Sequence, residues 1–96
     1  MSYIIYGWDT EDFYCNPCQK AKKILDVYKE KYIFKKLAKN YPTEEHVSNK
    51  ETLTLKLNEL DTKLETLPMI FTSEGKLIGG FTDLKTYILC GNKSNW

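Results

Sequence analysis

The chain has 96 residues, of which 42% are hydrophobic and 28% charged, and its formal net charge is +1. This length and composition predict one domain over residues 1–96, and a charge so near zero gives no general attraction to nucleic acid or to membranes. No apolar run reaches about 18 residues, the apolar opening is too short for a signal peptide, and three cysteines do not make a secreted disulfide framework. We therefore expect a cytoplasmic protein, and a monomer.

The first half of the chain predicts a strand, a helix and a second strand. Residues 3–6 form a short apolar strand that Gly7 ends, and residues 8–14 form a loop. A helix begins near Pro17, because the fixed φ of proline and its missing N–H suit a first helical turn. Residues 32–37 form the second strand. The apolar positions of the helix follow the i, i+3, i+4, i+7 spacing and are Ala21, Ile24, Leu25 and Tyr28.

A second helix follows a polar connection over residues 38–47, in which His46 is expected to be solvated. The sequence from Ser48 to Glu51 has the pattern of a capping box, in which serine and glutamate satisfy each other's backbone N–H groups. The second helix is therefore expected to start at Ser48. Its apolar positions at helical spacing are Leu53, Leu57, Leu60 and Leu64.

The last part of the chain predicts a β-hairpin and a closing helix. Pro68 ends the helical region, and residues 69–71 form the third strand. Residues 73–78 supply the hairpin turn and the fourth strand, which a Gly-Gly pair at 79–80 breaks. Thr82 is expected to cap the final helix. Its buried positions are expected to be Leu84, Tyr87 and Ile88, its end Gly91, and its loose tail residues 92–96.

These elements occur in the order βαβ, α, ββ, α. A βαβ crossover is right-handed and joins parallel strands, whereas a hairpin adds antiparallel ones. The expected fold class is therefore α/β, with a four-stranded mixed sheet flanked by helices on both faces.

Cys15-Asn16-Pro17-Cys18 lies between the first strand and the first helix and carries the most chemical information. A cysteine at a helix N-terminus ionises easily, because free N–H groups and the helix dipole stabilise the thiolate. The second sulfur lies one turn away, close enough for a disulfide, which is the arrangement of a thiol–disulfide oxidoreductase. Cys15 is then the nucleophile, with the Cys18 N–H as a hydrogen-bond donor to its sulfur, and Cys18 is the resolving thiol.

A zinc site is the alternative interpretation of the two cysteines. Zinc needs four ligands, and the remaining candidates, His46 and Cys90, are not at ligand spacing. We therefore expect no metal. Cys90 is expected to be a packing residue at the core boundary, with regulatory glutathionylation as the alternative.

Three motifs in this order resemble those of the glutaredoxins, from residue 3 to about residue 90. They are Cys15-Asn16-Pro17-Cys18 after the first strand, Thr66-Leu67-Pro68 before the third, and Gly79-Gly80-Phe81-Thr82-Asp83 after the fourth. The opening Tyr6-Gly7-Trp8-Asp9 is most similar to the short phage-encoded members, which work in the host cytoplasm. The resemblance implies the thioredoxin/glutaredoxin fold and a dithiol enzyme.

The resemblance also implies a glutathione site. The Leu67-Pro68 peptide is then cis, and the Leu67 backbone pairs with the cysteinyl part of glutathione or with a protein substrate. The N-terminus of the final helix holds the γ-glutamyl carboxylate, and Asp83 its amino group. The expected glutathione contacts are Tyr14, Leu67, Pro68, Gly80, Phe81, Thr82 and Asp83.

Acidic residues before the motif depart from the family pattern. They are Asp9, Glu11 and Asp12. Negative charge there opposes ionisation of Cys15 and repels an anionic ligand. Glutaredoxins commonly carry a lysine shortly before the first cysteine, which pairs with a glutathione carboxylate and is missing here. Lys20 or Lys23 is a candidate replacement, although both fit a solvated helix face better.

The resemblance implies that Cys15 attacks a protein disulfide or a glutathione mixed disulfide and that Cys18 resolves the intermediate. Glutathione is the implied reductant, no cofactor is tightly bound, and ribonucleotide reductase is the implied protein partner. A thioredoxin-like donor served by thioredoxin reductase is the closest alternative, because Pro17 precedes the second cysteine as in thioredoxins. An iron–sulfur cluster-binding module and a non-catalytic interaction domain are further alternatives; the rigid turn at Pro17 argues against the first and the cysteine pair against the second.

Overall fold

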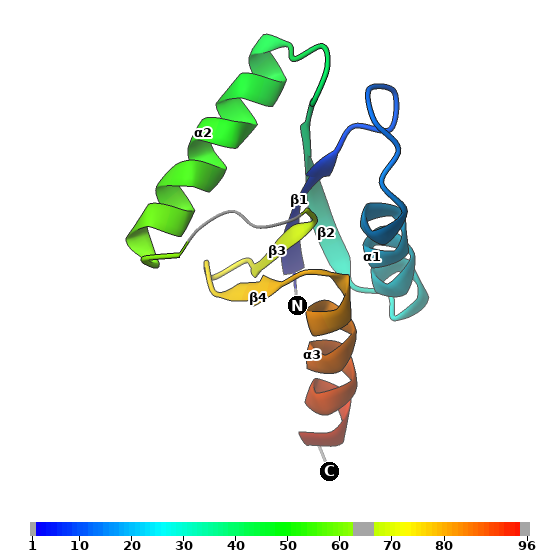
Figure 1. The fold of residues 1–96 in the computed structure, drawn as a ribbon. Coiled ribbons are helices and arrows are strands. Elements are labelled where there is room, and N and C mark those ends of the chain that lie inside the picture. The colour runs from blue at the N-terminus through cyan, green and yellow to red at the C-terminus, as the bar shows by residue number, and fades with distance from the viewer. Residues whose placement is uncertain (1, 63–66, 95–96) are drawn as a thin grey trace.

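The computed structural model describes residues 2–62 and 67–94, and of residues 90–94 the backbone alone (Figure 1). The elements occur in the predicted order. They are β1 (Ser2–Trp8), α1 (Asn16–Val27), β2 (Lys31–Leu37), α2 (Glu44–Glu59), β3 (Met69–Thr72), β4 (Leu77–Gly79) and α3 (Phe81–Ser94).

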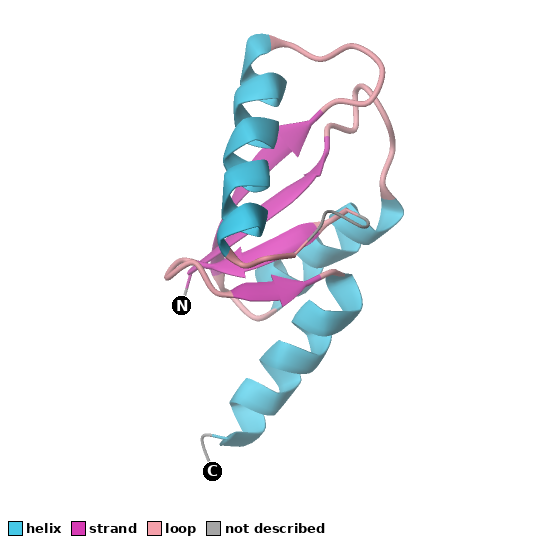
Figure 2. Cartoon of the chain, turned by 60° about the vertical axis from the view of Figure 1, so that its left-hand side comes forward, coloured by secondary structure: helices cyan, strands magenta, loops and turns pink. Residues whose placement is uncertain are grey.

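The strands form one mixed sheet in the order β2-β1-β3-β4. Strands β1 and β2 are parallel, as the helical crossover between them requires, and the pairs β1–β3 and β3–β4 are antiparallel. Helix α2 covers one face of the sheet, while α1 and α3 lie together on the other (Figures 1 and 2). The predicted α/β fold class is confirmed.

Alternation along β1 sends successive side chains to opposite faces of the sheet, and each face has its own core. Ile5 belongs to the core under α1 and α3, and Tyr6 to the core under α2. The buried members of the first core are Tyr3, Ile5, Ala21, Leu25, Ile70, Leu84 and Ile88. Those of the second are Tyr6, Leu37, Leu53, Leu57, Met69 and Phe71.

Helix α2 starts one turn earlier than predicted. Thr43 is the N-cap, and its backbone N–H donates to Nδ1 of His46 at 2.9 Å, so that these two residues form the capping box. The prediction that Ser48 starts the helix was wrong, as was the prediction that His46 is solvated, since it is 6% exposed. The histidine ring takes the place that glutamate or glutamine has in the usual pattern.

The end of α2 also differs from the predicted stripe. Leu53 and Leu57 are buried as predicted, but Leu60 is the C-cap and is 46% exposed. Because the helix ends there, Leu60 no longer follows the buried face. The remaining predicted position, Leu64, lies outside the described residues.

Two glycines predicted to end elements lie inside them. Gly7 is within β1, which continues to Trp8, and Gly91 is within α3, which continues to Ser94. Residues 92–94 are therefore helical rather than a loose tail, and 95–96 lie outside the described residues. Glycine lowers helix stability by about 1 kcal/mol relative to alanine, which a helix tolerates when its neighbours favour it.

Helix α3 begins at Phe81, so Thr82 is in its first turn and not at the predicted N-cap. The N–H of Leu84 donates to the carbonyl oxygen of Gly80 at 2.9 Å. A side chain for the cap is provided by Asp83, whose Oδ2 accepts from the Gly80 N–H at 3.2 Å. The side chain of Cys90, on the same helix, is outside the described part of the structure.

Candidate active site

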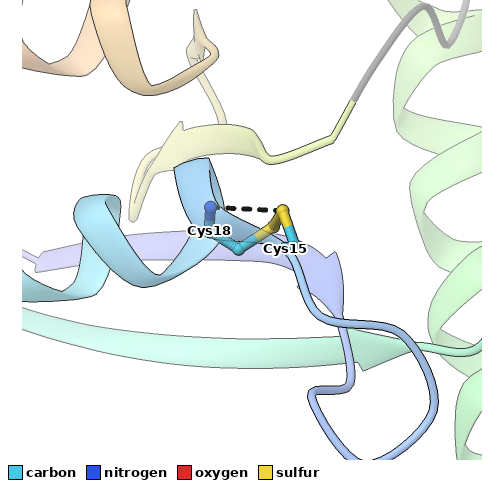
Figure 3. The surroundings of a disulfide bond; sticks show 2 residues. All are labelled: Cys15 and Cys18. Atoms are coloured by element: carbon cyan, nitrogen blue, oxygen red, sulfur yellow. Dashed lines mark hydrogen bonds between the residues drawn. A yellow bond between two sulfur atoms is a disulfide. The ribbon is translucent and has the colours of Figure 1, made fainter.

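Cys15 is the N-cap of α1 and has extended backbone angles, φ −124° and ψ 104°. Its Sγ accepts a hydrogen bond from the Cys18 N–H at 3.2 Å, as predicted (Figure 3). Pro17, in the same turn, has no N–H to offer, which leaves the Cys18 N–H directed at this sulfur. A negative charge on Cys15 Sγ is therefore stabilised by one donor and by the N-terminal end of the helix dipole.

The two cysteines are joined in a disulfide across the first turn of α1, with their Cα atoms 5.2 Å apart. Cys15 retains 6% of its accessible surface and Cys18 none. Of the two cysteines, only Cys15 can therefore be reached by a molecule from outside. The arrangement supports thiol–disulfide exchange at Cys15 first.

Gly7 gives the buried sulfur its space. A Cβ at Gly7 would lie 2.9 Å from Cys18 Sγ and 2.9 Å from the ring of Phe34. At such a distance a larger residue at position 7 would force Cys18 or Phe34 to shift, so the glycine lets β1 pass close behind the disulfide. The sequence prediction treated this glycine as a strand end and missed its role.

A groove of about 840 Å³ brings together most of the predicted glutathione contacts. It is lined by Pro17, Lys20, Thr62, Leu67, Pro68, Met69, Leu77, Gly79, Gly80, Phe81, Thr82 and Asp83. The Leu67–Pro68 peptide in this groove is cis, as the family resemblance implied. Tyr14 is not among the lining residues and is 65% exposed. Six of the seven expected contacts thus share one groove with the first turn of α1.

The start of α3 forms one part of the groove. Gly79 has φ +123°, and a Cβ there would meet the Asp83 carboxylate, so the backbone is close to this side chain. One carboxylate oxygen of Asp83 is held by the Gly80 N–H. The groove therefore contains a positioned negative charge beside free N–H groups at a helix N-terminus.

Lys20 also lines the groove, whereas Lys23 does not. The sequence prediction preferred a solvated helix face for both. The signal that separates them is spacing, since Lys20 lies three residues after Pro17 and so on the same side of the helix.

The carboxylate of Asp12 is a structural cap rather than a free charge beside Cys15. It accepts hydrogen bonds from the N–H groups of Lys39 at 2.7 Å, Asn40 at 2.9 Å and Tyr41 at 2.7 Å. These bonds, that from Asn40 first, hold the pKa of the Asp12 carboxyl below its usual value.

Asp9 is bonded both within its own loop and to the first turn of α2. Its carboxylate accepts from the Glu11 N–H at 3.0 Å and contacts Nε2 of His46 at 3.0 Å, and these bonds lower the pKa of the Asp9 carboxyl. Because Nδ1 of His46 accepts from Thr43, Nε2 carries the proton and donates to Asp9. Two of the three acidic residues before Cys15 thus anchor the loop over residues 9–14.

Within the described residues, no group of three or more His, Cys, Asp and Glu side chains is placed to hold a metal ion. In the same residues, none of the helices combines the length and the apolar character that crossing a membrane requires.

No family model matches the sequence. A curated glutaredoxin of Enterobacteria phage T4 is 34% identical to the chain over 86 residues, which covers 86% of this chain and 94% of that protein. The structure of a buckwheat glutaredoxin–glutathione complex has a TM-score of 0.64 at 21% identity, covering 93% of this chain and 69% of that one. Glutaredoxin 1 from Francisella tularensis, complexed with cacodylate, has a TM-score of 0.65 at 19% identity, covering 99% and 98%. The two solved structures show that the chain has the thioredoxin/glutaredoxin fold.

Proposed function

The chain belongs to the glutaredoxin family and is a thiol–disulfide oxidoreductase, and on this premise we propose that glutathione is its reductant. Its proposed substrates are protein disulfides and glutathione mixed disulfides. The observation that supports this most strongly is the groove beside the cysteine pair, which contains the cis Leu67–Pro68 peptide and the start of α3. The similar structure of buckwheat glutaredoxin, which is a complex with glutathione, supports the same choice of ligand.

In the proposed reaction the Cys15 thiolate attacks one sulfur of the substrate disulfide. A mixed disulfide forms at Cys15, and the other substrate sulfur leaves as a thiol. Cys18 then loses its proton, attacks Cys15 Sγ and releases the second substrate thiol, so that two electrons have moved to the substrate. Two glutathione molecules reduce the resulting Cys15–Cys18 disulfide and become glutathione disulfide.

Glutathione is proposed to lie along the groove. The Leu67 backbone pairs with its cysteinyl part, the N–H groups of Phe81 and Thr82 hold its γ-glutamyl carboxylate, and Asp83 holds its amino group. Pro68 and Gly80 line the groove without polar side chains. Tyr14 is proposed to cover the bound thiol from its exposed position next to Cys15.

The proposed setting is the cytoplasm, where residues 1–96 act as one monomeric domain and reduce ribonucleotide reductase. The similarity to the glutaredoxin of phage T4 supports this partner, because the resemblance to phage glutaredoxins implies ribonucleotide reductase as a substrate. A second candidate is a thioredoxin-like donor reduced by thioredoxin reductase. Pro17 favours it, because this proline occupies the position directly before Cys18.

One assay tests the proposed function against this second candidate. The oxidised protein is mixed with glutathione and glutathione reductase, and NADPH consumption is followed with a glutathionylated small-molecule disulfide. We expect turnover that disappears in Cys15→Ser. If the protein shows no turnover here but is reduced by thioredoxin reductase, the proposed function is wrong and the second candidate replaces it.

A further inference from the structure

Lys20 is the cationic residue among the described residues that line the groove. It extends from the second turn of α1 and is exposed, and it shares the groove with Thr82 and Asp83 of α3. Lys23 lies one turn further along α1, is also exposed, and does not line the groove. Lys20 therefore differs from Lys23 in its position in the groove, and not in exposure class or charge.

The packing of α1 against α3 explains why charged residues of both helices line one groove. Leu25 of α1 and Leu84 of α3 belong to the same buried core, which holds the two helices side by side on one face of the sheet (Figure 1). The groove at their N-terminal ends is thus lined by a lysine of α1, Lys20, and an aspartate of α3, Asp83. The carboxylate is held in place by the Gly80 N–H at 3.2 Å.

A pair of opposite charges in one groove complements a zwitterion, in which a carboxylate and an ammonium group share one carbon atom. The γ-glutamyl end of glutathione is such a group, whereas its glycyl end has a carboxylate alone. Lysine on one side and aspartate on the other would therefore distinguish the two ends of the tripeptide.

We propose that Lys20 binds the γ-glutamyl carboxylate of glutathione opposite Asp83, and that this lysine makes the enzyme selective for γ-glutamyl thiols. This inference rests on the proposed glutathione dependence. It gives the chain a cation in place of the lysine that the family carries before the first cysteine, where Asp12 instead caps the backbone of residues 39–41.

The effect of such a contact is modest and salt-dependent. An ion pair with an exposed lysine changes binding by about two- to fivefold, because water screens it and the side chain loses freedom. At about 1 M salt the screening length falls to about 3 Å, so the contribution of the pair should disappear.

The test compares wild type, Lys20→Gln and the matched control Lys23→Gln on three mixed disulfides of one peptide. The peptide carries glutathione, glutathione esterified at the glycyl carboxylate, or cysteinylglycine, which lacks the γ-glutamyl group. We expect Lys20→Gln to raise KM about two- to fivefold for the first two substrates, with kcat unchanged. We expect no rise for the cysteinylglycine peptide, no effect of Lys23→Gln, and no difference between the proteins at about 1 M salt.

Each other outcome overturns the inference in a recognisable way. An active wild type with an unchanged KM in Lys20→Gln would remove Lys20 from the site while leaving the proposed function intact. A rise in KM of Lys20→Gln that is absent with the glycyl ester would show that Lys20 contacts the glycyl carboxylate instead of the γ-glutamyl one. An equal penalty in Lys23→Gln would indicate a general charge effect. An inactive wild type would reject the proposed function itself, and this inference with it.

Discussion

Cys15 and Cys18 have different surroundings although one disulfide joins them. Cys15 is at the N-cap with part of its surface exposed, and the Cys18 N–H donates to its sulfur at 3.2 Å. Cys18 is fully buried behind it, against Gly7 of β1. A substrate can therefore reach one sulfur, while the other is placed to react with the intermediate.

Replacing each cysteine by serine tests this difference. We expect Cys15→Ser to abolish all activity, because the nucleophile is lost. Cys18→Ser should still cleave glutathione mixed disulfides, in which a second glutathione releases Cys15, but should lose reduction of protein disulfides. Both activities are measured on the same preparations by NADPH consumption. An active Cys15→Ser variant would contradict the assignment of the nucleophile.

The space behind Cys18 gives a second prediction at the scale of one residue. Gly7→Ala places a Cβ 2.9 Å from Cys18 Sγ and from the Phe34 ring. We expect a loss of about 1–3 kcal/mol in the free energy of unfolding from this overpacking, measured by urea denaturation. Gly80→Ala is the control, because its Cβ would lie 3.6 Å from the carbonyl oxygen of Pro68, an ordinary contact. Equal stability of the two variants would disprove the steric role of Gly7.

At the scale of elements, the loop over residues 9–14 is tied to the segment that leads into α2. Asp9 contacts His46, and Asp12 accepts three backbone N–H groups from residues 39–41. Lys36 of β2 adds ion pairs of 3.8 Å to Asp9 and 3.7 Å to Glu45. The chain that presents Cys15 is thus held by contacts nearly thirty residues away in sequence.

Asp12→Asn should lower stability in a pH-dependent manner. The lowered pKa of folded Asp12 means that its contribution is present above its ordinary pKa of 3.8 and is lost as the pH falls through the folded value. The stability difference between wild type and Asp12→Asn should therefore be full at neutral pH and shrink below pH 3.8. Urea denaturation from neutral pH down to acid measures it, with Glu11→Gln as the control. A difference that does not change with pH would contradict this account.

The start of α2 can be located by mutation. Thr43→Ala removes the N-cap side chain and should cost about 0.5–2 kcal/mol of stability. Ser48→Ala, at the position that the sequence pattern favoured, should cost much less because Ser48 lies inside the helix. Urea denaturation of the two variants decides between the two starts. A larger loss for Ser48→Ala would restore the original prediction.

At the scale of the whole molecule, one sheet separates two cores. Ile5 and Ile70 are paired on neighbouring strands and belong to the core under α1 and α3. Leu57 belongs to the core under α2, on the other face. The site lies where the start of α1 and the start of α3 meet the cis Leu67–Pro68 peptide, so all its parts depend on the sheet for their positions.

The separation of the cores predicts additive stability losses across the sheet. Ile5→Val should cost about 0.5–1.5 kcal/mol and Leu57→Ala about 2–5 kcal/mol. The double variant should lose the sum within about 0.5 kcal/mol, because the two side chains share no buried neighbours. Ile5→Val with Ile70→Val, in one core, is the comparison expected to deviate. A large deviation across the sheet would show that the two cores are coupled.

Local patterns in the sequence were sufficient for the element order, the fold class and the cysteine pair. Apolar spacing predicted Leu25 and Leu57 as buried. The cis peptide at Leu67–Pro68 was implied by the family resemblance, because the local sequence alone favours an ordinary trans proline. Element ends were less predictable, because Gly7 and Gly91 have the same local signal whether they end an element or lie inside one.

The chemistry of this protein can be predicted from a short stretch of its sequence, because the cysteine pair and the helix that begins there are local features within a few residues. The surroundings of the two cysteines depend instead on contacts that form only when the chain folds. His46 is bonded to Asp9, the partners of Asp12 come from residues 39–41, and Lys20 lines its groove together with residues of α3. Each of these contacts joins segments far apart in the chain, and their distance is set by packing on the sheet rather than by any local pattern.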